Sequence, residues 1–254
     1  MTGSPRTEAE ALAIQDALRP QVIDAPGPSD PATVAGLDVA YHEDGERLAA
    51  AIVVLDARTH AVLDSAVVHG RPAFPYVPGL FAFREVPTLL EALDRLRVRP
   101  EVLICDGHGL AHPRRFGLAC HLGVLTGLPS FGVGKTPLVG AWEPVGERRG
   151  ARSELVDGGE VVGAVLRTRD AVKPVFVSVG HRINLGTACG LTLALTPRFR
   201  LPETTRAADR ACRDALAERT PRCNGPETVT PRRWDRLVTD APLRSASLNC
   251  RAEE

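Results

Sequence analysis

Three acidic residues stand inside or beside apolar segments, where an unpaired carboxylate is costly. Asp38 lies within TVAGLDVAY, Glu85 lies within AFREVP, and Asp106 follows the apolar segment EVLIC. A carboxylate in such a place must be paired or metal-bound to offset its lost hydration. Each acid has a simpler explanation, as a residue at a strand end, beside an arginine, in a turn or at a helix start. As a set, they favour a hard divalent cation, Mg²⁺ or Mn²⁺, which prefers oxygen ligands.

Asp106 opens a glycine-rich segment that also carries basic side chains. Residues 101–140 read EVLICDGHGLAHPRRFGLACHLGVLTGLPSFGVGKTPLVG. His112 is followed closely by two arginines, and Lys135 is one of only two lysines in the chain. Ligands of open α/β sheets gather at the carboxyl ends of strands. The segment therefore predicts a phosphate and metal site, in which His112 either holds a phosphate or water or is an ordinary loop histidine.

Three more familiar sites fit this segment poorly. A zinc site made of His108, His112 and His121 is disfavoured, because Pro113 interrupts any single helix that would present them together. GVGKT resembles the end of a Walker A loop, but Pro129 stands where its first glycine is required. DGHGLAH has two glycines of a dinucleotide fingerprint, with His112 in the third position. A mononucleotide or NAD site is therefore not predicted.

Tyr76 lies in a stiff loop, between Pro75 and Pro78 in FPYVPG. A rigid loop that presents an aromatic ring is suited to wedging between stacked bases. The alternative is that the ring packs onto the protein core.

The composition limits the class and location of the protein. The chain has 254 residues and a formal net charge of zero. This neutrality disfavours nonspecific attraction to nucleic acid unless arginines cluster locally. No apolar run approaches the ~20 residues that span a bilayer, and the N-terminus lacks a secretion signal, so we expect a cytoplasmic protein without membrane contact. The six cysteines form no CxxC pair, which argues against a zinc or disulfide framework.

Apolar periodicity predicts alternating strands and helices. The predicted helices are 8–19, 87–96, 117–126, 185–195 and 204–218. The predicted strands are 34–41, 48–55, 62–69, 101–105, 130–133, 161–167 and 175–179. Short separators make the first three strands a meander and the last two a hairpin, and residues 140–160 are expected to be irregular.

This order of elements predicts an α/β fold with a mixed sheet and flanking helices. Residues 1–219 are expected to form a single catalytic domain. Residues 220–254 are rich in Pro, Arg and Ser without periodicity, and we expect a flexible C-terminal tail.

Six blocks of sequence follow one another from residue 34 to about 210: AGLDVAY, PYVPGLFAFRE, ICDGHGLAHPRRFGLACHLG, GVGKTPLVG, VSVGHRINLGTA and RLPETTRAAD. In content and order they resemble the endonuclease V family of nucleases, which act on deaminated purines. The resemblance implies a ribonuclease-H-like fold with helices on both faces of the sheet. It also implies Mg²⁺-dependent hydrolysis of the second phosphodiester bond 3′ to deoxyinosine, leaving a 3′-hydroxyl and a 5′-phosphate, with Mn²⁺ as a substitute.

The resemblance also implies residue roles, motif by motif. The metal ligands would be Asp38, Asp106 and Glu85, with Asp209 as a weaker candidate. His112 and Lys135 would contact the phosphates around the scissile bond. The wedge that holds the strands apart would be Tyr76, Val77, Pro78 and Gly79. The hypoxanthine pocket would be lined by Gly79, Phe81, Gly107, Gly109 and Leu138.

The chain departs from the family pattern at Thr204, where proline is expected, and after residue 219, where no counterpart is found. Two alternatives stay open: a structure-selective Mg²⁺-dependent nuclease and a non-catalytic nucleic-acid binder. The acid set argues against the binder, which has no use for carboxylates that face phosphate. The expected partner is inosine-containing DNA, with RNA left open, and the protein is expected to be a monomer.

Overall fold

One mixed eight-stranded sheet forms the centre of the molecule, in the order β3-β2-β1-β4-β5-β8-β7-β6. The computed structural model describes residues 4–217, and the predicted tail lies outside them. β4 pairs in parallel with both β1 and β5, and the other pairs are antiparallel. The strands are β1 (Thr33–Tyr41), β2 (Leu48–Asp56), β3 (Val62–Gly70), β4 (Val102–Cys105), β5 (Ser130–Gly134), β6 (Arg152–Asp157), β7 (Glu160–Leu166) and β8 (Val175–His181).

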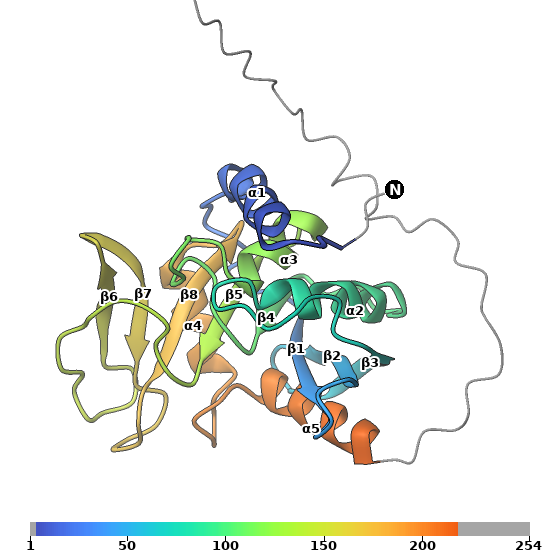
Figure 1. The fold of residues 1–254 in the computed structure, drawn as a ribbon. Coiled ribbons are helices and arrows are strands. Elements are labelled where there is room, and N and C mark those ends of the chain that lie inside the picture. The colour runs from blue at the N-terminus through green and yellow to red at the C-terminus, as the bar shows by residue number, and fades with distance from the viewer. Residues whose placement is uncertain (1–3, 218–254) are drawn as a thin grey trace, which may run out of the picture.

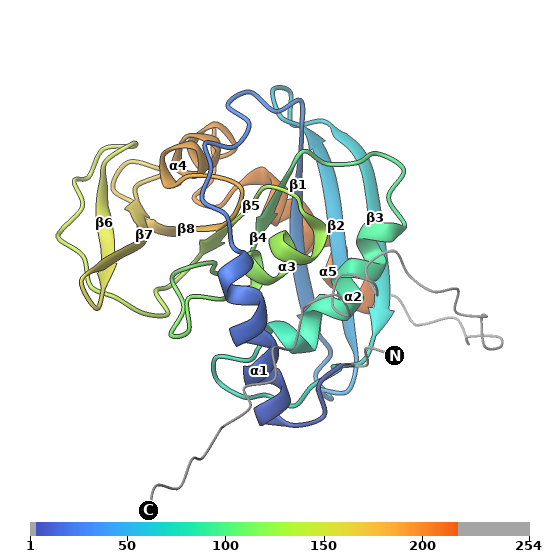
Figure 2. The ribbon, with the colours of Figure 1, turned by 90° about the horizontal axis from the view of Figure 1, so that it is seen from above.

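Helices cover both faces of this sheet (Figures 1 and 2). One face carries α1 (Glu8–Leu18), α2 (Ala82–Asp94) and α3 (Leu118–Thr126), and the short 3-10 helix η1 (Arg19–Gln21) follows α1. The other face carries α4 (Leu185–Ala194) and α5 (Glu203–Ala217). The expected fold class, a mixed sheet with helices on both sides, is confirmed. None of the helices within residues 4–217 is long and apolar enough to cross a membrane.

Strand β1 divides its side chains between two cores, as its alternation predicts. Ala35 and Leu37 are fully buried toward α2 and α3, while Val34 is buried in the core that includes α4 and α5. Gly36 faces α5, and a Cβ there would lie 2.1 Å from the carbonyl oxygen of Thr204. The backbone at the start of α5 therefore packs directly against β1 at Gly36, two residues before Asp38.

Two predicted boundaries were wrong. Helix α2 begins at Ala82 rather than Pro87, because burial of Phe83 and Val86 outweighs the backbone hydrogen bond lost at the proline. Strand β6 occupies part of the segment expected to be irregular. It is an edge strand of sequence RSELVD, whose two apolar residues, Val156 and the fully buried Leu155, are adjacent, so it has no apolar alternation.

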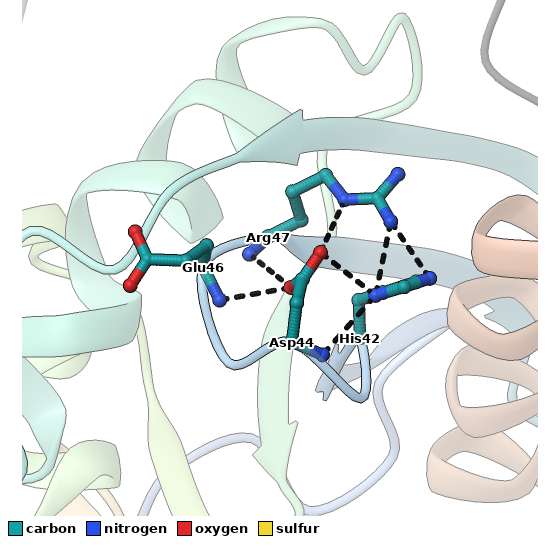
Figure 3. Close-up of polar contacts among 4 residues, drawn as sticks. All are labelled: His42, Asp44, Glu46 and Arg47. Atoms are coloured by element: carbon teal, nitrogen blue, oxygen red, sulfur yellow. Dashed lines mark hydrogen bonds and ion pairs between the residues drawn. The ribbon is translucent and has the colours of Figure 1, made fainter.

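A charged turn joins β1 to β2 (Figure 3). The Asp44 carboxylate accepts hydrogen bonds from the backbone N–H groups of Glu46, at 2.9 Å, and Arg47, at 3.2 Å. Arg47 Nε also donates to Asp44 at 2.9 Å. These bonds hold the pKa of Asp44 down, at about 2. The turn follows Tyr41 directly, so it fixes the end of β1 where the candidate site lies.

Candidate active site

The three predicted acids converge where the parallel pairing of β1 and β4 ends. Leu37 on β1 pairs with Cys105 on β4, so Asp38 and Asp106 are the next residues of adjacent strands. The backbone N–H of Asp106 donates to the Leu37 carbonyl at 3.1 Å. Glu85 reaches the same place from α2, and all three acids line one pocket of about 570 Å³.

This pocket carries an excess of negative charge. Burial, together with the charge of Asp106, raises the pKa of Asp38 to about 7. Burial and the charges of Asp38 and Asp106 raise the pKa of Glu85 to about 8, against the lowering effect of a hydrogen bond from Tyr41. The acids are therefore close enough to repel one another, which is the setting in which a cation is stabilising.

Lys135 supplies the local positive charge. Its Nζ donates a hydrogen bond to Asp106 Oδ2 from the loop after β5. Burial opposes the charged form of Lys135, but this bond and the charge of Asp106 raise its pKa. Within residues 4–217, no three His, Cys, Asp or Glu side chains lie close enough together to hold a metal ion as they stand. Lys135 instead occupies one carboxylate oxygen of Asp106.

Glu85 is held by two residues that the sequence did not single out. Tyr41 Oη donates to Glu85 Oε1 at 3.2 Å. The guanidinium carbon of Arg84 lies 5.2 Å from the centre of the Tyr41 ring, and Arg84 Nη1 donates to the carbonyl of Phe74 at 2.9 Å. Tyr41 lies on the face of β1 opposite Asp38, and this alternation was the only signal that it faces α2.

The predicted wedge and most of the predicted base pocket line the same cavity as the acids. The residues concerned are Tyr76, Val77, Pro78, Gly79, Phe81, Gly107 and Leu138. Tyr76 is 69% exposed and lies edge-on to Phe81, with the ring centroids 5.9 Å apart, so its ring does not pack into the core. Gly79 has a φ of +80°, a conformation that favours glycine.

Gly109 does not line the pocket, contrary to the prediction. A Cβ at Gly109 would lie 1.9 Å from the Val179 carbonyl oxygen, and its N–H donates to Ser178 Oγ at 2.8 Å. The residue is a glycine because the loop packs directly against β8. The glycines of GVGK have a similar role, since a Cβ at Gly134 would lie 2.5 Å from the His108 ring.

His112 holds the wedge rather than facing open solvent. It is 5% exposed, and its Nδ1 accepts the backbone N–H of Arg114 at 3.1 Å. The Gly79 carbonyl accepts a hydrogen bond from the same ring. Burial lowers the pKa of His112 to about 4, so the ring is neutral at pH 7. Both ring nitrogens thus have protein partners, and the predicted phosphate contact is not preformed.

Gln15 on α1 is a further residue that sequence reasoning missed. Its Nε2 donates to the carbonyls of Gly79, at 3.0 Å, and Phe116, at 3.3 Å. Gln15 is 1% exposed and shares the buried face of α1 with Ala11 and Leu18. A polar residue on the apolar face of an amphipathic helix was the available signal.

The remaining candidates lie farther from the chemistry. His121 packs edge-on against Phe83 in the core, with ring centroids 4.9 Å apart, which agrees with rejecting a three-histidine zinc site. Asp209 on α5 pairs with Arg213 at 2.9 Å and does not line the pocket. Its charge nevertheless contributes to the raised pKa of Asp38, so it lies near the acids.

Comparison with known proteins agrees with this geometry. The sequence model of the Endonuclease V family matches residues 16–210. The chain belongs to the Endonuclease V family. It is therefore a nuclease. Endonuclease V of Nocardia farcinica is 60% identical over 217 residues, which cover 85% of this chain and 96% of the relative.

Solved Endonuclease V structures share the fold. The enzyme of Streptomyces avermitilis superposes with a TM-score of 0.82 at 56% identity, covering 85% of this chain and 96% of that one. Endonuclease V of Ciona intestinalis superposes with a TM-score of 0.72 at 27% identity, covering 82% of this chain and 97% of that one. The Ciona structure is a complex with a 24mer DNA that contains an inosine followed by a ribo-adenosine.

Proposed function

We propose that this protein is a metal-dependent endonuclease of DNA repair that cuts inosine-containing DNA. It would hydrolyse the second phosphodiester bond 3′ to deoxyinosine and leave a 3′-hydroxyl and a 5′-phosphate. One observation carries the proposal: the acids and the wedge, which come from separate segments, line a single pocket. The complex of the Ciona relative with inosine-containing DNA supports the choice of lesion.

The residues present fit a hard divalent cation. Asp38, Glu85 and Asp106 offer only oxygen atoms, the chemistry that Mg²⁺ and Mn²⁺ prefer. Burial, with the charges of the neighbouring acids, raises the pKa values of Asp38 and Glu85, and a bound cation would stabilise their charged forms. These three acids would hold the ion, with Asp209 as an outer candidate. When bound, the ion supplies a water of lowered pKa and positive charge against the phosphate.

The protein's own groups position the scissile phosphate. Without substrate, the Lys135 ammonium donates a hydrogen bond to Asp106. When a cation binds Asp106 in its place, the ammonium would donate to a phosphate oxygen of the substrate. Tyr41 orients Glu85 through its hydroxyl. The buried surroundings of these acids strengthen each electrostatic contact to the phosphate.

Base recognition would use the opposite wall of the pocket. Tyr76 is exposed on a proline-stiffened loop and would enter the base stack as the inosine leaves it. The cavity of about 570 Å³ lies within the usual range for a small-molecule ligand. Backbone groups at Gly79 and Gly107 are available to the hypoxanthine edge, and His112 with Gln15 keeps Gly79 in place.

The test uses labelled duplexes that are identical except for one inosine, incubated with Mg²⁺, Mn²⁺ or EDTA. We expect a single cut at the second phosphodiester 3′ to the inosine with either metal, and none with EDTA. The same strand made as RNA, added as a competitor, would decide between DNA and RNA.

Equal cutting of both duplexes would instead identify a structure-selective nuclease. Selective binding of the inosine duplex without cutting under any condition would identify a binding protein. Cutting that persists in EDTA would contradict the metal site.

A further inference from the structure

A second hollow lies on the far side of the Lys135 loop from the base pocket. Its volume is about 350 Å³, and its lining includes Lys135, Trp142, Arg167, Lys173, Phe176 and Arg200. We call this hollow the basic groove. Four of these six residues are cations, and no acidic residue lines the groove.

Lys135 pairs with Asp106, but the other three cations of the groove have no ion pair within residues 4–217. The hydrogen bonds of the Arg167 and Arg200 guanidinium groups within residues 4–217 go to backbone carbonyl oxygens. No salt bridge within residues 4–217 involves Arg167, Lys173 or Arg200. Since carbonyls are neutral, the two arginines are held rigidly and still present their charge to a ligand. Fixed, unpaired cations are suited to a polyanion.

An aromatic side chain stands beside these cations. Trp142 is 40% exposed and lies edge-on to Phe176, with centroids 5.1 Å apart and an interplanar angle of 74°. The contact with Phe176 braces the indole, which remains partly exposed to solvent. Cations that track a backbone, next to an aromatic ring on which bases stack, are the features of a single-strand binding groove.

The groove is continuous with the candidate active site. Lys135 Nζ contacts Asp106, while the Lys135 carbonyl accepts a hydrogen bond from Arg200 at 2.6 Å. Residues 135–137 line the groove, and the next residue, Leu138, lines the base pocket. A strand that leaves the acids past Lys135 therefore arrives directly in the basic groove.

We propose that the basic groove binds the nucleic-acid strand on the 3′ side of the cut. One base would stack on Trp142, and the phosphates would lie against Lys173 and the two arginines. This inference rests on the proposed function, which places the inosine in the base pocket and the cut on its 3′ side. The 3′ strand is then the one that passes Lys135.

The test varies the length of the strand 3′ to the cut. Inosine-containing single strands would end either two or eight nucleotides beyond the cut, with the 5′ side unchanged. Binding would be measured in EDTA and single-turnover cutting in Mg²⁺, using the full chain. We expect wild type to bind the longer strand about five- to tenfold more tightly, the effect of one stacked base and its phosphates.

Trp142→Ala and Lys173→Ala should each remove part of this advantage and leave binding of the shorter strand unchanged. Trp142→Phe should retain it, and Lys173→Ala should reduce the salt slope of binding by roughly 0.7. The control is Arg99→Ala, which removes an exposed cation near the amino end of β4, away from the carboxyl-end site. This variant should bind both the shorter and the longer strand as tightly as wild type does.

Equal wild-type affinity for the two strands would overturn the inference. So would a Trp142→Ala defect of equal size on both strands, because it would reflect damage to the fold. If wild type cuts neither strand, the proposed function fails, while the binding comparison still decides whether the groove holds the longer strand.

Discussion

The acid pocket and the basic groove share one wall but have opposite electrostatics. In the pocket, Asp38 and Glu85 have raised pKa values because negative charge is crowded and buried. In the groove, Arg167, Lys173 and Arg200 have no carboxylate partner among residues 4–217. The first arrangement suits the proposed cation, and the second suits the proposed phosphate chain.

This separation explains how a chain of zero net charge can bind nucleic acid. The composition argued against such a partner unless arginines clustered locally. The structure provides that clustering, and it keeps the arginines in place with carbonyl hydrogen bonds rather than with acids. Net charge therefore fails as a guide when the two signs occupy different surfaces.

The largest effect should come from removing one acid from the pocket. Asp38→Asn should reduce cutting of the inosine duplex by roughly a thousandfold, since replacing a charged carboxylate ligand with a neutral amide removes about 4 kcal/mol of transition-state stabilisation. Binding of the inosine duplex in EDTA should stay near wild type, because the base pocket and groove are intact. Single-turnover kinetics and equilibrium binding measure the two parts. Near-normal cutting would refute the metal assignment.

The pH dependence of stability should also separate the two regions. The folded-state pKa is raised from 3.8 to about 7 for Asp38 and from 4.5 to about 8 for Glu85. At a pH between the unfolded and the folded pKa of each group, the folded protein keeps a proton that the unfolded chain has lost. The free energy of unfolding in EDTA should therefore fall from about pH 4 to pH 8, by up to about 1.4 kcal/mol per pH unit for each group.

Urea unfolding between pH 4.5 and 8.5 measures this slope. In Asp38→Asn, the slope of the free energy of unfolding against pH should be smaller by the contribution of one titrating group. Asp44→Asn is the control. Because the pKa of Asp44 is lowered in the folded state, its contribution to stability is lost only as the pH falls below the unfolded value of 3.8, outside the range of the measurement. An unchanged slope in Asp38→Asn would show that the pocket is not electrostatically strained.

The wedge and the groove each present one exposed aromatic side chain, Tyr76 and Trp142, whose effects on binding can be compared. Tyr76→Ala should weaken binding of the inosine duplex by about 1–3 kcal/mol, the usual loss of one stacked aromatic. Because the ring is 69% exposed, stability should change by less than about 0.5 kcal/mol. Tyr76→Phe should bind normally. The loss of binding in Tyr76→Ala should not depend on the length of the 3′ strand, whereas the loss in Trp142→Ala should. If both losses depend on that length, the wedge and the groove are not separate binding sites.

The smallest effect should come from the support of the base pocket. Gln15→Leu removes the amide that bonds the Gly79 and Phe116 carbonyls and should cost about 1–2 kcal/mol of stability. KM for the inosine duplex should rise several-fold with little change in kcat, because the acids are untouched. Gln21→Leu is the matched control, since the exposed Gln21 amide donates to the carbonyl of Ala17, four residues earlier, and not to the base pocket. Equal effects of the two variants would remove the positioning role.

Much of the scaffold could be predicted because it depends on local pattern. The alternation of β1 placed Asp38 and Tyr41 on opposite faces, and the short turns placed β1, β2 and β3 side by side. The position of Asp106 followed from the end of an apolar strand. These features are encoded within a few residues of each other.

The missed features depend on contacts between distant segments. Gln15 bonds residues 64 and 101 positions away in the sequence. The Lys135 pair with Asp106, the exclusion of Gly109 from the pocket and the basic groove likewise follow from how β5 and β8 pack against the loop after β4. Sequence periodicity does not predict contacts between distant segments. The polar residue Gln15 on the apolar face of α1 was the one available signal of such a contact.

The contacts of α1 mean that the family boundary and the physical boundary of the enzyme differ. The family match starts at residue 16, immediately after Gln15. A chain shortened to that boundary would keep every carboxylate of the pocket. It would lose the first two turns of the helix, the Thr7 cap on Glu10 and the amide that holds Gly79. The smallest unit that preserves the base pocket therefore includes the start of α1, about two helical turns before the point where the family match begins.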